Sequence, residues 1–294
     1  MASTERPAAS PSAAHEPKRG APTVSVVIPA FNEHETIRAC VLAVLDQTVP
    51  AFEIIVVDNA STDDTAAIVH ELQNGCPNAP IVYLLQDALQ GITPTRNAGF
   101  DRARGDIIGR IDSDSVVEPN WVEEVQKAFA DPDVAAATGP AIYYDMPLRR
   151  FGARADDLLR RTQVTIAHDY HLLFGSNMAI RTTAWKAVSP STCADLDDIG
   201  HEDIDLSIHL HEAGLTVIYW PDMVSGMSAR RLDDSPSEFF DYVMRFERTY
   251  EKHNIRSLSL RAPMAVFLAA YPALKAMRKA ELRMLADESD DPSI

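Results

Sequence analysis

Short apolar, β-branched runs alternate with segments of helical periodicity through the first half of the chain. Each run predicts a buried strand, and the runs are Val24 to Ile28, Glu53 to Val57, Ile81 to Leu85 and Ile107 to Ile111. The helical segments are Glu33 to Gln47, Ser61 to Gln73, Thr93 to Arg104 and Pro119 to Ala130. Alternating strands and helices form right-handed units around a mainly parallel sheet. The sequence therefore predicts an α/β fold with a Rossmann-like sheet and helices on both of its faces.

The second half of the chain is less regular. The predicted elements are an arginine-rich helix over Leu148 to Ile166, a short strand or ordered loop over Leu173 to Ile180, a helix over Glu202 to Ala213, a strand over Leu215 to Trp220 and an amphipathic helix over Pro236 to His253. Residues 1–22 are rich in Ala, Ser, Pro and charge, so they predict a disordered tail rather than a secretory signal. We expect one domain over 23–255 and a helical segment over 256–294.

Composition excludes several classes of function. A net charge of -16 does not favour nucleic-acid binding, because phosphates repel an acidic chain. Three distant cysteines, Cys40, Cys76 and Cys193, predict packed thiols in a reducing cytoplasm, with neither a disulfide framework nor a zinc site.

No apolar run reaches the roughly 20 residues of a membrane-spanning helix. The longest candidate, Ala262 to Leu274, contains two prolines.

Carboxylates follow two of the predicted strands. Asp58 ends the second strand, and Asp112 and Asp114 follow the fourth. Ligands bind beyond the carboxyl ends of the strands in such sheets. Paired carboxylates suit Mg²⁺ or Mn²⁺, which would neutralise a diphosphate leaving group. Taken alone, Asp112 to Asp114 are more simply explained as an acidic turn that caps the next helix.

A second acidic segment, His201 to Leu206, begins a predicted helix. One of its carboxylates has the chemistry of a general base toward a hydroxyl, although a charged helix start is the simpler interpretation of this segment alone.

His209 and His211 lie two residues apart, on different sides of a helix, and we interpret them as ordinary residues. The glycine-rich phosphate loops and the nucleophile elbow are absent.

Six motifs in order resemble the family 2 glycosyltransferases of the GT-A fold. They are Val24 to Glu33, Val56 to Thr65, Thr95 to Gly99, Asp112 to Asp114, Gly175 to Arg181 and Glu202–Asp203. Each motif is weak alone, but their shared order is specific, and they span roughly Val24 to Leu232. The resemblance implies an inverting enzyme that moves a sugar from a nucleotide-diphosphate donor to an acceptor hydroxyl by direct displacement.

The resemblance also implies roles for individual residues. The donor would contact Pro29, Phe31, Glu33, Asp58, Asn59, Arg96, Asp112 and Ser113. Asp112 and Asp114 would hold Mg²⁺ or Mn²⁺, and Asp203 would deprotonate the acceptor. Gly175, Asn177 and Glu202 would lie on the acceptor side.

The chain departs from the family pattern at three places. Asn59 replaces an aspartate that often contacts the base, so the nucleotide stays open. Val224 to Arg231 lacks a late histidine for the metal, and Arg230 and Arg231 become candidates for holding phosphates. The Gln-x-x-Arg-Trp motif of processive synthases is also missing, which favours a single addition. The alternatives are a catalytically silent sugar-nucleotide binder or scaffold and, less favoured, a nucleotidyltransferase.

Basic residues flank the apolar run near the C-terminus. They are Arg256, Arg261, Lys275, Arg278, Lys279 and Arg283. A basic amphipathic helix can lie on an anionic membrane, here the inner face, where a lipid-linked acceptor would be found. We favour the other explanation, which is a helix packed on the domain.

Overall fold

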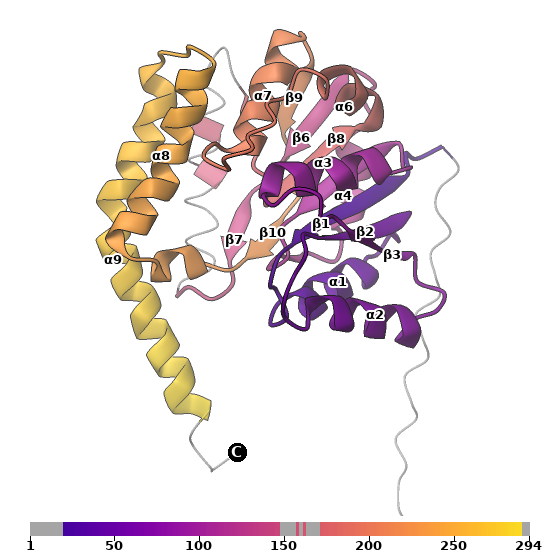
Figure 1. Cartoon of the computed structure of the whole chain (residues 1–294), viewed down its shortest axis with the longest axis horizontal. Helices are drawn as coiled ribbons and strands as arrows, with labels where there is room; N and C mark the ends of the chain where they lie inside the picture. Colours follow the sequence, from indigo (N-terminus) through magenta and orange to yellow (C-terminus); the bar gives the residue numbers. More distant parts are fainter. Residues whose placement is uncertain (1–19, 148–156, 159–160, 163–170, 290–294) are drawn as a thin grey trace, which may run out of the picture.

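The computed structural model describes residues 20–147, 157–158, 161–162 and 171–289. It confirms the α/β fold: a seven-stranded sheet has the order β3-β2-β1-β4-β8-β6-β9 (Figure 1). The strands are β1 Val24–Ala30, β2 Glu53–Asp58, β3 Ile81–Leu85, β4 Ile107–Ile111, β6 Val134–Thr138, β8 Asn177–Arg181 and β9 Thr216–Tyr219. Only β8 runs antiparallel to its neighbours in this sheet, so the sheet is mainly parallel. Most of the predicted tail and of the helix over Leu148 to Ile166 lies outside the described residues.

Helices cover both faces of the sheet because successive strand residues point to opposite sides. Val26 and Ile28 belong to one apolar cluster, with side chains of α1, α2 and α4. Val27 belongs to the other, with side chains of α3, α6 and α7. The helices are α1 Ile37–Leu45, α2 Thr65–Gly75, α3 Ile92–Arg102, α4 Trp121–Ala128, α6 Thr182–Val188 and α7 Glu202–Glu212.

A small second sheet was not predicted from the sequence. It has the order β5-β10-β7, formed by β5 Val116–Val117, β10 Ser225–Met227 and β7 Ala141–Tyr143. β5 directly follows Asp112 to Asp114, and β10 directly precedes the short helix η1 Arg230–Asp233. The pairing of β10 with β5 therefore brings the arginines of η1 to the acidic loop.

The C-terminal segment is a long helix that packs on the rest of the chain. α8 Pro236–Lys252 and α9 Leu258–Ser289 lie side by side, and the rings of Phe239 and Tyr271 stack at 4.1 Å between their centroids (Figure 1). Two of the basic residues are paired inward: Arg261 donates to Glu247 at 2.7 Å, and Arg278 donates to Asp233 at 2.8 Å. Among the residues that the structure describes, none of the helices has the length and apolar content needed to cross a bilayer.

Candidate active site

The carboxyl ends of β1, β2 and β4 place the first predicted residues at one edge of the sheet. Asp58, the last residue of β2, is in register with Ala30, the last residue of β1. Its carboxylate accepts hydrogen bonds from Ser61 N at 2.9 Å and from the hydroxyl of Tyr83 at 2.6 Å. Phe31 follows β1 and is 48% exposed, whereas Pro29 is buried within the strand. An exposed ring beside a fixed carboxylate is suited to a heterocyclic base.

The side chain of Asn59 holds the neighbouring loop. Its amide nitrogen donates to the carbonyls of Gln86 at 2.8 Å and Leu89 at 2.9 Å. Its carbonyl oxygen accepts from Gly91 N at 2.8 Å. These bonds occupy the amide, so Asn59 shapes the wall of the site, and a contact between Asn59 and the base stays a prediction.

An ionic cluster joins the first motif, the acidic loop and η1. The guanidinium of Arg230 pairs with both carboxylate oxygens of Glu33, and its Nε lies 3.1 Å from Oδ2 of Asp114. Burial, and then the charge of Asp112, raise the pKa of Asp114 to about 7 although Arg230 opposes the shift. Arg230 thus lies against the predicted metal-binding carboxylate, and its contact with donor phosphates stays a prediction.

Arg110 connects the two acidic motifs and was missed by sequence analysis. Its Nη2 donates to Asp112 Oδ1 at 3.0 Å, and its Nη1 lies 2.7 Å from Glu202 Oε1. Burial raises the pKa of Asp112. Burial also opposes ionisation of Glu202, but the positive charges of Arg110 and Arg96 outweigh it and lower the pKa of Glu202. The only sequence signal for this role is a charged residue inside the apolar strand β4.

Asp203, the predicted base, lies at the start of α7, and two backbone N–H groups hold its carboxylate. Its Oδ2 accepts from Gly175 N at 2.7 Å, and its Oδ1 accepts from Ile204 N at 2.8 Å. Burial, and then the charge of Glu202, raise the pKa of Asp203. A Cβ atom on Gly175 would lie 1.5 Å from Arg110 Nη1, so glycine is needed for this approach.

Arg96 lies beneath the site rather than in it. Its side chain is fully buried, and its Nη1 donates to the carbonyl of Glu202 at 2.8 Å. Its guanidinium carbon lies 5.4 Å from the ring centroid of Trp185. Arg96 therefore supports the first turn of α7, and the predicted contact between Arg96 and the donor phosphates is not confirmed.

The remaining predicted residues lie around this centre. Ser113 is buried at the acidic loop, and Arg231 pairs with Asp234 at 3.2 Å. Asn177 is fully buried: its amide accepts from Trp121 Nε1 at 2.8 Å and donates to two backbone carbonyls. Asn177 thereby fixes the backbone next to the site, and its acceptor-side role stays a prediction.

Comparisons with known proteins identify the family and the fold of the chain. The family model described as Glycosyl transferase family 2 matches residues 25–188, and the model described as Glycosyl transferase family group 2 matches residues 107–273. Glycosyltransferase AglE of Haloferax volcanii is 38% identical over 104 residues, which are 35% of this chain and 34% of that protein. Uncharacterized glycosyltransferase YibD of Escherichia coli is 26% identical over 237 residues, which are 79% of this chain and 65% of that protein.

A solved structure shares the fold. It is that of mannosyltransferase PcManGT from Pyrobaculum calidifontis in complex with GDP-Man and Mn²⁺, with a TM-score of 0.65 and 19% identity. The similarity covers 92% of this chain and 77% of the other. The chain spans only about a third of the length of AglE, so family and fold are what these similarities establish. Because a family model matches more than half of its residues, this chain belongs to glycosyl transferase family 2.

Proposed function

We propose that the chain is an inverting glycosyltransferase that moves one sugar from a nucleotide-diphosphate donor to an acceptor hydroxyl. The observation that carries the proposal is the pairing of Arg110 with both Asp112 and Glu202. This buried arginine joins Asp112 to Glu202, the residue directly before Asp203, although the two acidic motifs lie about 90 residues apart in the sequence. Direct displacement requires the base and the leaving group on opposite sides of one carbon, and two joined acidic motifs supply both functions.

Asp112 and Asp114 fit a divalent cation. Both are carboxylates on one short loop, and Asp114 is buried enough that its pKa rises to about 7. Hard cations such as Mg²⁺ and Mn²⁺ prefer carboxylate and phosphate oxygens. When bound, the cation would neutralise the diphosphate that leaves the sugar.

Arg230 is the residue that we propose binds the donor phosphates. Its side chain is 50% exposed, and it already lies between Glu33 and Asp114. A guanidinium forms two parallel hydrogen bonds with phosphate as well as with carboxylate. We infer that the phosphates replace part of the carboxylate pairing when the donor binds. GDP-mannose is the first donor to test, because PcManGT binds it on the same fold.

Asp203 would take the proton of the acceptor hydroxyl. The N–H groups of Gly175 and Ile204 hold the carboxylate in one orientation, and burial makes it a better proton acceptor by raising its pKa. The proton would pass to Asp203 as the acceptor oxygen bonds to the anomeric carbon and the bond to the diphosphate breaks. The acceptor class stays open, and a lipid-linked acceptor would explain the apolar side chains that α9 exposes, such as Val266 and Met284.

The test is Asp203→Asn, compared with Asp197→Asn. Asp197 is exposed in the loop that precedes α7, so its variant controls for a change of charge nearby. Transfer is measured with a panel of sugar nucleotides and acceptors, and donor binding is measured by calorimetry with Mn²⁺. We expect Asp203→Asn to bind donor normally and to lose at least about a hundredfold in transfer rate, because general-base catalysis contributes that much.

Two results would contradict the proposal. Full transfer by Asp203→Asn would exclude this residue as the base. Donor binding by the unaltered chain, with no transfer to any acceptor in the panel, would instead support a catalytically silent sugar-nucleotide binder or scaffold.

A further inference from the structure

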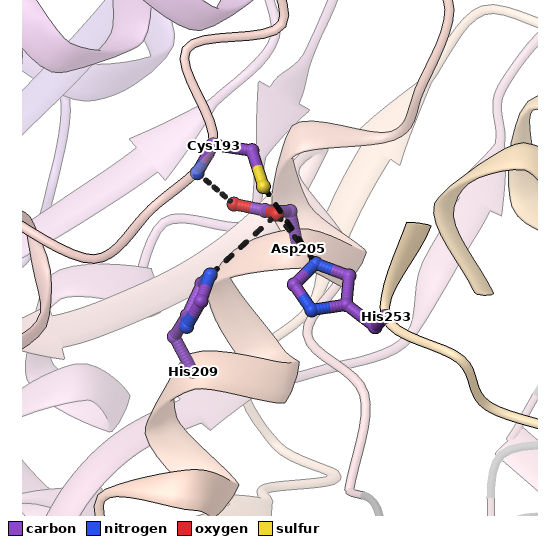
Figure 2. Close-up of side chains that lie close together, drawn as sticks. All are labelled: Cys193, Asp205, His209 and His253. Carbon is purple, nitrogen blue, oxygen red and sulfur yellow. Dashed lines mark hydrogen bonds and ion pairs between the residues drawn. The ribbon is translucent and has the colours of Figure 1, made fainter. Parts of the chain in front are cut away.

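A group of metal-binding side chains lies apart from the acidic loop. One candidate ligand atom from each of Cys193, Asp205, His209 and His253 lies within 4.8 Å of those from the other three (Figure 2). Cys193 comes from the loop after α6, Asp205 and His209 come from α7, and His253 caps the C-terminal end of α8. The sequence alone contains no sign of this group: it predicts a packed thiol at Cys193 and an ordinary residue at His209, because only the fold brings the distant positions 193 and 253 together.

The group lies on a different side of α7 from the candidate base. Asp205 and His209 are four residues apart, so they lie on one side of the helix. Asp203 is only two residues before Asp205, and residues with that spacing point in different directions. Asp203 contacts Gly175 N, whereas Asp205 Oδ2 accepts from Cys193 N at 3.0 Å. The group is therefore distinct from the acidic site.

Among the residues that the structure describes, one buried nitrogen of this group has no hydrogen-bond partner. Asp205 Oδ1 lies 2.8 Å from His253 Nε2, which satisfies that pair. His209 Nε2 is buried without a hydrogen-bond partner, and it lies 3.7 Å from Asp205 Oδ1. His209 Nδ1 lies 3.1 Å from Glu212 Oε2.

The contact with Glu212 favours one tautomer of His209. In the neutral ring, Nδ1–H donates to the Glu212 carboxylate, so Nε2 carries a lone pair on the side of Asp205. A buried lone pair beside a carboxylate lacks a donor, and a cation between the two would satisfy both. Histidines that bind metals commonly donate their other N–H to a carboxylate in this way.

We propose that Cys193, Asp205, His209 and His253 bind a structural zinc ion. Tetrahedral zinc places its sulfur, nitrogen and oxygen ligands about 3.3 to 3.6 Å from one another. The distances of 3.7 Å from His209 to Asp205 and 3.9 Å from Cys193 Sγ to His253 Nε2 are close to that geometry. The 2.8 Å contact between Asp205 Oδ1 and His253 Nε2 is shorter, and it would lengthen as the ring proton moves from Nε2 to Nδ1 and both atoms bind the ion. The Cys193 thiolate and the Asp205 carboxylate together balance the charge of the ion, and the thiol proton passes to solvent.

The ion would join three segments around the first turn of α7. It would bind the loop after α6, α7 itself and the end of α8, because each supplies at least one ligand. Binding to the folded chain alone stabilises that chain. Zinc is a structural ion here, so the site makes no demand on the proposed transfer reaction.

The test uses the full chain purified without chelators and then dialysed against zinc. We expect about one zinc ion per chain by elemental analysis, a melting temperature a few degrees above that of the chelator-treated chain, and a thiolate-to-metal absorption band after replacement by Co²⁺. Cys193→Ser and His209→Gln should lose the ion, whereas the matched variants Cys76→Ser and His211→Gln should keep it. Asp114→Asn should also keep it, which separates this site from the acidic loop.

Several results would overturn the proposal. They are a folded chain with no zinc above the level in buffer, a cobalt spectrum without the thiolate band, and retention of zinc by both Cys193→Ser and His209→Gln. If either variant fails to fold, the cobalt spectrum of the unaltered chain still decides whether a cysteine binds the ion. Loss of zinc from Asp114→Asn would assign the ion to the acidic loop instead.

Discussion

Arg230 Nε lies 3.1 Å from Asp114 Oδ2, while the other nitrogens of the same guanidinium pair with Glu33. The guanidinium of Arg230 thus joins the loop after β1, the loop after β4 and η1. The half-exposed guanidinium balances two carboxylates that would otherwise repel an incoming diphosphate.

Arg230→Ala should weaken donor binding. Hydrogen bonds to charged groups contribute about 1.5 to 3 kcal/mol, so we expect the dissociation constant of the donor to rise about 10- to 100-fold. Arg248→Ala is the control, because Arg248 is on α8 and pairs only weakly with Asp241, at 3.4 Å. Calorimetric titration with donor and Mn²⁺ measures both variants. Equal affinity in both would remove Arg230 from the donor site.

Asp114→Asn should uncouple nucleotide binding from the cation. The amide brings no negative charge to Mn²⁺, so we expect the gain in nucleotide affinity with Mn²⁺ to fall by more than about tenfold. Asp133→Asn, at an exposed position, controls for the loss of one charge. Thermal shift with GDP or UDP, with Mn²⁺ or EDTA, measures the effect. An unchanged response in Asp114→Asn would place the cation elsewhere.

Gly175→Ala should disrupt the link between the two acidic motifs. The new Cβ would lie 1.5 Å from Arg110 Nη1. Arg110 must move, which weakens its pairing with Glu202 and shifts the N–H that holds Asp203. Breaking a buried ion pair costs about 3 to 5 kcal/mol, and we expect a comparable loss of stability together with lost transfer.

Gly75→Ala is the matched control for Gly175→Ala. A Cβ at Gly75 has no atom within 4 Å. Urea unfolding and transfer assays should therefore show little change in Gly75→Ala. Near-native stability and activity in Gly175→Ala would mean that the backbone moves easily and that the close approach to Arg110 is not required.

The central strands could be predicted because their burial leaves a continuous sequence signal. Ile81 to Leu85 and Ile107 to Ile111 have the predicted bounds, and β2 extends the prediction by one residue, to Asp58. β5 and β10 could not be predicted, because strands of two and three residues have no periodicity. α1 begins at Ile37 rather than at the predicted Glu33, whose side chain contacts Arg230.

Residues of the candidate site could be proposed from the sequence only where a motif carries its own chemistry. Asp112, Asp114 and Asp203 stand out as carboxylates at strand and helix ends. Arg110 could not be identified, because its function depends on Glu202, which is distant in sequence and adjacent in the fold. Arg96 shows the reverse case. It is a charged residue within a motif, but its side chain is fully buried and donates to the backbone of α7.

The exposed side of α9 should mediate any membrane contact. Val266 and Met284 are each 55% exposed, and their spacing places them on one side of the helix. We expect the double variant Val266→Glu, Met284→Glu to bind anionic liposomes with an affinity at least about tenfold lower. The reason is that each apolar side chain contributes about 1.5 kcal/mol or more when it is buried. Leu85→Glu, on β3, is the control. Equal sedimentation of all three proteins with liposomes would contradict membrane contact through α9.

Glu53 should make stability depend on acid pH. Its buried carboxylate accepts from Ser25 Oγ at 2.8 Å, Arg104 N at 2.7 Å and Arg104 Nη2 at 2.8 Å. Burial favours the neutral form, but these hydrogen bonds outweigh it and lower the pKa of Glu53 from 4.5. A lowered pKa in the folded state gives stability that is fully present above the unfolded pKa and is lost as pH falls through the folded value.

At pH 7 the free energy of unfolding of Glu53→Gln should therefore be lower than that of the unaltered chain by about 1 to 3 kcal/mol. This difference in stability should narrow below about pH 4. Glu71→Gln is the control, since Glu71 is 69% exposed and its pairing with Arg38 should contribute less than about 1 kcal/mol. Urea unfolding between pH 3 and 7 measures all three proteins, over a range that includes the ordinary pKa of a glutamate side chain. A difference between Glu53→Gln and the unaltered chain that stays constant over this range would mean that the ionised carboxylate does not stabilise the fold, and that the loss at pH 7 comes from packing alone.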